Sequence, residues 1–122
     1  MTEPVQPSMA AMQLREWGGP LELARIPRRQ PLPTEVLVRV HAAGVNPVDL
    51  FTCEGRAYNR ALALPHVPGW DVSGVVEAVG YGVTRFRKGD AVFGMPWFPR
   101  EGGAYAQYVT APARHFAHKP AR

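Results

Sequence analysis

The sequence predicts a mainly β fold, a small β-barrel with a few short helices. Apolar and polar positions alternate along several short stretches, and in residues 35–43 every second residue from Val36 to Val40 is valine. This period of two is typical of a strand. Glycine or proline stands between neighbouring stretches, as turn residues do. Many short strands separated by turns favour a barrel over a helical bundle.

Six strands follow from this pattern. In chain order they are predicted at Met12–Trp17, Leu21–Ile26, Glu35–Ala43, Val72–Val79, Ala91–Met95 and Ala104–Val109. Each stretch is short and is bounded by turn residues, which is the usual sequence signature of a strand.

One helix is expected between the third and fourth of these strands. It begins after Asn46, whose side-chain oxygen can accept a backbone N–H of the first turn. Pro47 supplies the fixed φ that suits the first helical position, and Asp49 places a negative charge in the positively polarised first turn. The helix is expected to run to about Cys53, where Gly55 ends it.

The length of the chain bounds its domain organisation. A chain of 122 residues with 46% hydrophobic residues forms one domain. We expect residues 12–122 to make up this domain and residues 1–11 to be a disordered lead, because Pro4, Pro7 and Ser8 do not support a regular element. The lead has neither the basic start of a secretory signal nor an apolar membrane span.

The charged residues and the cysteine exclude several classes of function. Fourteen basic and ten acidic residues give a net charge of +4. The charges are scattered and no aromatic side chains interleave with them in a binding motif, so we expect no nucleic-acid binding. Cys53 is the only cysteine, so neither an intramolecular disulfide nor a cysteine-based metal site can form within the chain. These features suit a cytoplasmic protein.

Four motifs occur in a fixed order along the chain. They are Gly-Val-Asn-Pro-Val-Asp-Leu at 44–50, Pro-Gly-Trp-Asp-Val-Ser-Gly at 68–74, Lys-Gly-Asp-Ala-Val-Phe-Gly at 88–94 and Gly-Gly-Ala-Tyr-Ala at 102–106. With these motifs the chain resembles the catalytic domain of the medium-chain dehydrogenase/reductase superfamily, and within it the zinc-free quinone oxidoreductase branch to which zeta-crystallin belongs. The resemblance implies a GroES-like, partly open β-barrel.

The resemblance also marks two positions where zinc-dependent relatives carry metal ligands. This chain has Asn46 in place of a cysteine and Trp70 in place of a histidine. An amide and an indole do not replace thiolate and imidazole as zinc ligands. His115 and His118 are three residues apart, but no third ligand is close in sequence, so they are interpreted as ordinary histidines. We expect no bound metal.

Candidate site residues also follow from the resemblance. It places Asn46 near the nicotinamide and substrate, as the catalytic residue that donates an amide N–H to the acceptor carbonyl. It places Tyr58 near the cofactor and the substrate, although an exposed loop tyrosine is the alternative. Phe51, Tyr58 and Trp97 are candidates for the wall of a substrate pocket. For Phe51 and Trp70, a place in the core is the favoured interpretation.

The implied cofactor is NADPH, but this chain offers no complete site for it. A dinucleotide site needs a glycine-rich turn that leads from a strand into a helix. Residues 80–85 read Gly-Tyr-Gly-Val-Thr-Arg, which lacks the third glycine and predicts a β-turn. The C-terminal Rossmann domain of the relatives is therefore expected to be absent.

Two functions from different classes remain open. In the first, the chain is the catalytic portion of a zinc-independent, NADPH-dependent quinone or enone oxidoreductase, with little or no activity alone, and a separate dinucleotide-binding chain completes it. In the second, it is a non-enzymatic, free-standing GroES-like module that acts by binding a partner. For the first function we also expect self-association through uncovered β surface. Val72, Val75, Val76 and Val79 are the candidates for contacts with the missing partner of this domain.

Overall fold

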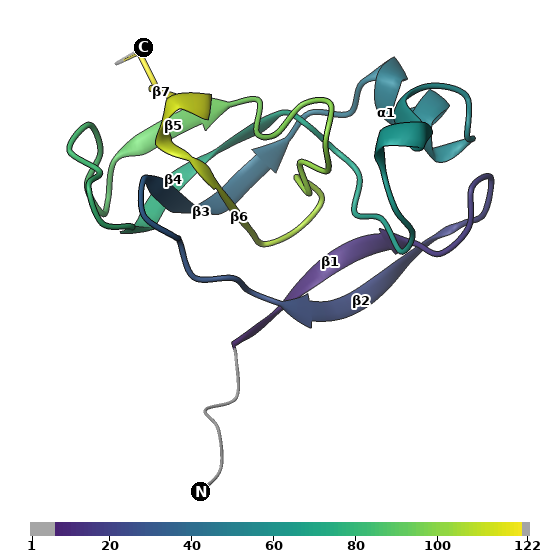
Figure 1. Ribbon diagram of the computed structural model, residues 1–122, viewed down its shortest axis with the longest axis horizontal. Helices are drawn as coiled ribbons and strands as arrows, with labels where there is room; N and C mark the ends of the chain where they lie inside the picture. Colours follow the sequence, from purple (N-terminus) through teal and green to yellow (C-terminus); the bar gives the residue numbers. More distant parts are fainter. Residues whose placement is uncertain (1–6, 121–122) are drawn as a thin grey trace, which may run out of the picture.

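The computed structural model describes residues 7–120 and confirms the mainly β fold (Figure 1). A five-stranded sheet curls into a half-barrel, and a two-stranded hairpin lies along one side of it (Figure 1). The strands are β1 (Ser8–Leu14), β2 (Leu21–Pro27), β3 (Glu35–Ala43), β4 (Val72–Val79), β5 (Ala91–Gly94), β6 (Tyr108–Pro112) and β7 (Phe116–His118). The helical elements are α1 (Pro47–Cys53) and the short 3₁₀ turns η1 (Tyr58–Ala61) and η2 (Ala113–His115).

All neighbouring strands of the larger sheet are antiparallel, in the order β6-β3-β4-β5-β7. Strands β3 and β4 form its centre, with Val36 opposite Val79 and Ala43 opposite Val72. The register between them shifts twice, once after Leu37 and once after Val40. Such irregularities bend a strand and increase its twist, which is how the sheet curls.

Two isolated bridges join β1 of the hairpin to the rest of the fold. Ala11 forms an isolated bridge with Ala106, and Leu14 forms one with His66. The end of β1 therefore pairs with the loop around His66, which leads into β4.

The core lies inside the curled sheet. Alternate residues of the strands point into it, so Val72, Gly74 and Val76 of β4 are buried while their neighbours are partly exposed. The buried cluster consists of Val36, Val38, Val72, Val76, Phe86, Val92, Ala104, Val109, Ala111 and Phe116. Burying one Val or Phe side chain contributes about 1.5–3 kcal/mol. The prediction that Val72 and Val76 contact a partner is wrong, because their side chains are only 4% and 0% exposed.

Several predicted bounds agree with the structure and others do not. Strands β3 and β4 and the start of α1 lie where the sequence predicts them. The prediction of a disordered lead over residues 1–11 is wrong for Ser8–Ala11, which belong to β1 and pair with β2; residues 1–6 lie outside the described part. The last predicted strand is displaced, since β6 begins at Tyr108. Within residues 7–120, no helix is long and apolar enough to cross a membrane.

Candidate functional site

Helix α1 begins as the sequence predicts. Asn46 precedes the helix with extended backbone angles, φ −118° and ψ 155°, and Pro47 occupies the first helical position. Asn46 and Asp49 form a capping box. Its carboxylate half is a hydrogen bond of 2.9 Å donated by the Asn46 backbone N–H to Asp49 Oδ2. The backbone around Asn46 is therefore held on the N-terminal side of the helix.

The side chain of Asn46 has a second carboxylate partner. Its Nδ2 donates a hydrogen bond to Oδ2 of Asp71, the residue just before β4. The two residues meet because β3 and β4 are paired up to Ala43 and Val72, and the backbone N–H of Gly44 then donates to the Asp71 carbonyl at 3.0 Å. Asp71 therefore accepts one of the two N–H bonds of the amide that was predicted to donate to a substrate.

Asp49, in the first turn of α1, is buried, with a residual exposure of 1%. The Tyr105 hydroxyl donates to Asp49 Oδ2 at 3.1 Å. Burial, together with the negative charge of Asp49 and this hydrogen bond, raises the pKa of Tyr105 well above its usual range. Burial and the charge of Asp49 likewise raise the pKa of the Cys53 thiol. Tyr105 therefore stays protonated and serves as a donor to the carboxylate.

A cleft of about 460 Å³ is lined by Asp71, the hydrogen-bond partner of Asn46. Gly44, Asp71, Val72, Phe93 and Met95 are among the residues that line it. The side chains of Phe93 and Met95 are 46% and 47% exposed. The cleft therefore combines one carboxylate with an apolar wall, which is the usual make-up of a site for a small organic ligand. Neither Phe93 nor Met95 was predicted as a site residue, although the alternation around the inward-facing Val92 places Phe93 on the outer side of β5, and Met95 directly follows this strand.

Trp70, unlike Asn46, has apolar and fully buried surroundings. Its side chain is 1% exposed, so the prediction that it belongs to the core is confirmed. Its ring packs edge-on against Tyr58 and Phe98, with centroids 6.0 and 5.1 Å away, and those two rings are 4.9 Å apart. Edge-to-face contacts at these distances are the favoured geometry of aromatic pairs. Position 70 is therefore closed by aromatic packing.

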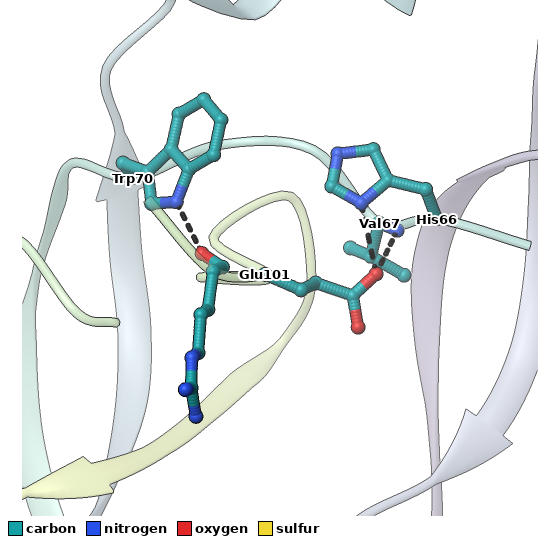
Figure 2. Close-up of polar contacts among 5 residues, drawn as sticks. His66, Val67, Trp70 and Glu101 are labelled. Carbon is teal, nitrogen blue, oxygen red and sulfur yellow. Dashed lines mark hydrogen bonds and ion pairs between the residues drawn. The ribbon is translucent and has the colours of Figure 1, made fainter. Parts of the chain in front are cut away.

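Two side chains fasten the loop after β5 to the segment that contains Trp70 (Figure 2). The Trp70 indole Nε1–H donates to the carbonyl oxygen of Arg100 at 2.6 Å. Oε1 of Glu101 accepts from the Val67 backbone N–H at 2.7 Å and lies 3.0 Å from Nδ1 of the buried His66. Because a carboxylate only accepts, Nδ1 of His66 carries the proton. Glu101 is thus the hydrogen-bond partner of the His66 ring.

The three predicted pocket residues are not gathered around one cavity. Phe51 is 44% exposed and lies under the Arg56 guanidinium at 5.1 Å, so the favoured core interpretation is wrong for it. Tyr58 is 39% exposed and packs against the closed position 70. Trp97 lines a different cavity, of about 310 Å³, and its Nε1 donates to the Thr110 carbonyl at 2.9 Å.

The histidines near the C-terminus have structural partners. His115 Nδ1 accepts the Trp97 backbone N–H at 3.1 Å, and His118 Nε2 lies 3.2 Å from the Arg85 carbonyl. Burial lowers the pKa of His115, and the positive charge of Arg114 adds to this effect. Across residues 7–120, no three His, Cys, Asp or Glu side chains gather as a metal site would require. With Asn46 and Trp70 at the two positions marked by the resemblance, the described residues do not fit a zinc ion.

The sequence was also compared with known protein families. Residues 32–121 match the alcohol dehydrogenase GroES-like domain. The chain belongs to this family. Its alignment covers α1, the Asn46–Asp71 pair and all strands from β3 onward, so the family relationship includes the whole site described above.

Several relatives of this chain are quinone oxidoreductases of the medium-chain dehydrogenase/reductase superfamily. The human quinone oxidoreductase is 43% identical over 117 residues, which cover 93% of this chain and 34% of that protein. The structure of the quinone oxidoreductase from Coxiella burnetii has a TM-score of 0.89 and 33% identity, covering 94% of this chain and 38% of that one. A mycobacterial protein solved in complex with NADPH has a TM-score of 0.78 and 38% identity, covering 93% of this chain and 33% of that one. The chain thus spans about a third of the length of these relatives.

The described residues do not fit a complete dinucleotide. The glycine-containing stretch at 80–82 lies between β4 and β5, which are antiparallel neighbours, and no helix follows it. A pyrophosphate site of the Rossmann type needs backbone N–H groups at the start of a helix. Helix α1, of seven residues, is preceded by Asn46 and carries the buried Asp49 in its first turn, and this negative charge does not suit a phosphate.

Proposed function

We propose that this chain is the catalytic-domain portion of a zinc-independent, NADPH-dependent quinone or enone oxidoreductase. The observation that carries the proposal is the 43% identity with the human quinone oxidoreductase over 93% of this chain. The apolar cleft beside the Asn46–Asp71 pair supports it, because a flat, weakly polar acceptor needs an apolar wall and few hydrogen-bond donors.

In this proposal Asn46 acts on the acceptor through its carboxamide. The N–H that Asp71 does not accept is directed to a carbonyl oxygen of the substrate. That oxygen gains negative charge as the carbonyl compound is reduced, and a positioned donor stabilises the charge most strongly where it develops. Phe93 and Met95 provide apolar contact for the ring of the acceptor. Tyr58, Phe51 and Trp97 do not line this cleft.

A dinucleotide-binding unit outside the described residues has to complete the enzyme, so we propose that this chain has little or no activity without it. Apolar side chains around α1 support the presence of such a partner surface. Val45, Leu50 and Phe51 are 70%, 57% and 44% exposed. A group of exposed apolar side chains beside a cleft is typical of a surface that another domain covers.

Zinc independence is supported by the residues at positions 46 and 70. Metal analysis of untagged protein tests it: we expect no stoichiometric zinc. One tightly held zinc per chain would overturn this part of the proposal.

The whole proposal is tested with a chimera. The matched third of the human quinone oxidoreductase is replaced by residues 7–120 of this chain, and oxidation of NADPH by 1,4-benzoquinone is followed. We expect turnover in the chimera and none with the chain alone. Asn46→Ala should lower kcat about 10²- to 10³-fold, the usual cost of losing a donor to a developing oxyanion. Tyr81→Ala, at a side chain that is 87% exposed, is the control. A folded chimera without turnover would contradict the proposal and favour the binding module.

A further inference from the structure

We propose that Asp71 is a positioning residue that sets the orientation of the Asn46 carboxamide, so that a single N–H is presented to the acceptor. This inference rests on the proposed function, since it assigns the donor role of Asn46 to one N–H of its side chain. Asp71 itself does not touch the reacting atoms in this arrangement. It acts through Asn46.

The orientation follows from the chemistry of the two partners. An amide side chain can rotate by 180° and exchange its oxygen and nitrogen at little cost unless its neighbours distinguish them. The Asp71 carboxylate only accepts hydrogen bonds, so it selects the nitrogen of Asn46. The backbone N–H of Asp49 donates at 3.0 Å to the backbone carbonyl of Asn46 and makes no side-chain hydrogen bond with it. Because the carboxamide has a single nitrogen, the contact with Asp71 alone determines which end faces that carboxylate.

The backbone is shaped for this contact. A Cβ atom on Gly44 would lie 3.0 Å from the Asp71 Cβ and 3.4 Å from the Asn46 Nδ2. A side chain at position 44 would thus press on both members of the pair, and glycine lets them approach. The cleft borders the same place, because Gly44 and Asp71 both line it.

The charge of Asp71 adds to its geometric effect. Hydrogen bonds to an ionised acceptor are about twice as strong as bonds between neutral groups. Asp71 is half-buried, so its bond to Asn46 is shielded from bulk water on part of its surface. One amide proton of Asn46 is therefore bound to a carboxylate while the other is the one left for a ligand, and among residues 7–120 no other hydrogen bond from Nδ2 is present.

A spectroscopic experiment on the unaltered chain tests the orientation without any catalysis. The chain contains two asparagines, Asn46 and Asn59, so the side-chain amide signals of Asn59 are an internal reference in ¹H–¹⁵N NMR. We expect one Asn46 amide proton to be shifted downfield and to exchange more slowly than either proton of Asn59. If the Asn46 and Asn59 signals behave alike in the wild-type chain, the proposal is wrong, whatever any variant does.

Asp71→Asn extends this test. The new amide can pair with either end of Asn46, so we expect the downfield shift and the slow exchange to be lost. The matched control is Asp90→Asn, which removes an equal charge from a turn where Asp90 accepts the Arg87 N–H at 3.0 Å. Asn46 signals that change equally in both variants would contradict a specific role of Asp71.

The chimera separates positioning from a structural role. Asp71→Asn should lower kcat about 10- to 100-fold with a smaller change in KM, as expected when a donor is displaced. Because Asp71 acts through Asn46, the double variant Asn46→Ala/Asp71→Asn should be no slower than Asn46→Ala. Additive losses would overturn the proposal. If the chimera shows no turnover, the proposed function fails, while the NMR comparison still decides the orientation.

Discussion

Positions 46 and 70, which the resemblance marks as metal-ligand positions in zinc-dependent relatives, have opposite surroundings in this fold. Trp70 is buried against Tyr58 and Phe98 and is tied to the carbonyl of Arg100. Asn46 is half-buried and makes a polar contact with Asp71, which lines an apolar cleft. One position serves packing and the other keeps a polar group accessible. The two positions therefore differ in what their side chains do in this fold: Trp70 fills the interior, and Asn46 offers hydrogen-bonding groups next to Asp71.

The largest expected effect on stability is at Trp70. Trp70→Ala removes a fully buried ring and its hydrogen bond, so we expect a loss of about 3–5 kcal/mol in the free energy of unfolding. Urea denaturation followed by circular dichroism measures it. The control is Tyr81→Ala, at an exposed ring, which should stay within about 0.5 kcal/mol of the wild type. A loss below about 1 kcal/mol for Trp70→Ala would show that position 70 is not closed by packing.

Glu101 holds the loop that covers Trp70 in place through two hydrogen bonds. Glu101→Ala leaves the buried His66 Nδ1–H and the Val67 N–H without their acceptor, which costs about 1–3 kcal/mol. Glu101→Gln keeps an oxygen acceptor and should recover most of this loss. Denaturation of the two variants side by side decides the point. Equal losses for Ala and Gln would mean that the charge of Glu101 matters more than its two hydrogen bonds.

At the open position, the expected effect on stability is smaller. Asn46→Ala removes a helix cap and should lower the free energy of unfolding by about 1 kcal/mol. Asn46→Ser keeps a capping oxygen and should recover part of the loss. Asn46→Asp places a third carboxylate beside Asp49 and Asp71 and should melt below the Ser variant. Thermal melts of the three proteins measure this. An Asp variant as stable as Asn46 would argue against the contact with Asp71.

The smallest effect concerns His115, which accepts the Trp97 N–H beneath the same loop. Burial lowers the pKa of His115 from its ordinary value of 6.5, so the unfolded chain takes up this proton more readily than the folded chain. Its contribution to stability is therefore complete above pH 6.5 and is lost as the pH falls through the folded-state pKa. Between about pH 7 and pH 5, the melting temperature should decrease less steeply with falling pH for His115→Asn than for the wild type. If the melting temperatures of both proteins decrease equally with falling pH, the lowered pKa of His115 in the folded state is contradicted.

Local patterns were sufficient for the centre of the fold. The alternation in Glu35–Ala43 and Val72–Val79 predicts β3 and β4 at their observed bounds, and Asn46 with Pro47 predicts the start of α1. These elements follow from periodicity and capping, which act over a few residues.

The remaining elements depend on distant partners. The bounds of β6 are set by its pairing with β3, where Pro112 lies opposite Glu35. The contact of His66 with Glu101 joins residues 35 positions apart. Phe51 has the composition of a core residue, yet α1 turns it outward. No pattern within a short window contains this information, because it is determined by which segments the folded sheet brings together.

The position at which translation starts determines how much of β1 the protein contains. The chain has methionines at positions 9 and 12 as well as at position 1. Translation from Met9 would remove only the first residue of β1, whereas translation from Met12 would remove Ser8–Ala11, the first four of its seven residues. It would also remove the bridge from Ala11 to Ala106 and the two hydrogen bonds between Ala10 and Gln107. A product shortened in this way would expose the pairing edge of β2, so a recombinant protein trimmed at its N-terminus should still begin before Ser8.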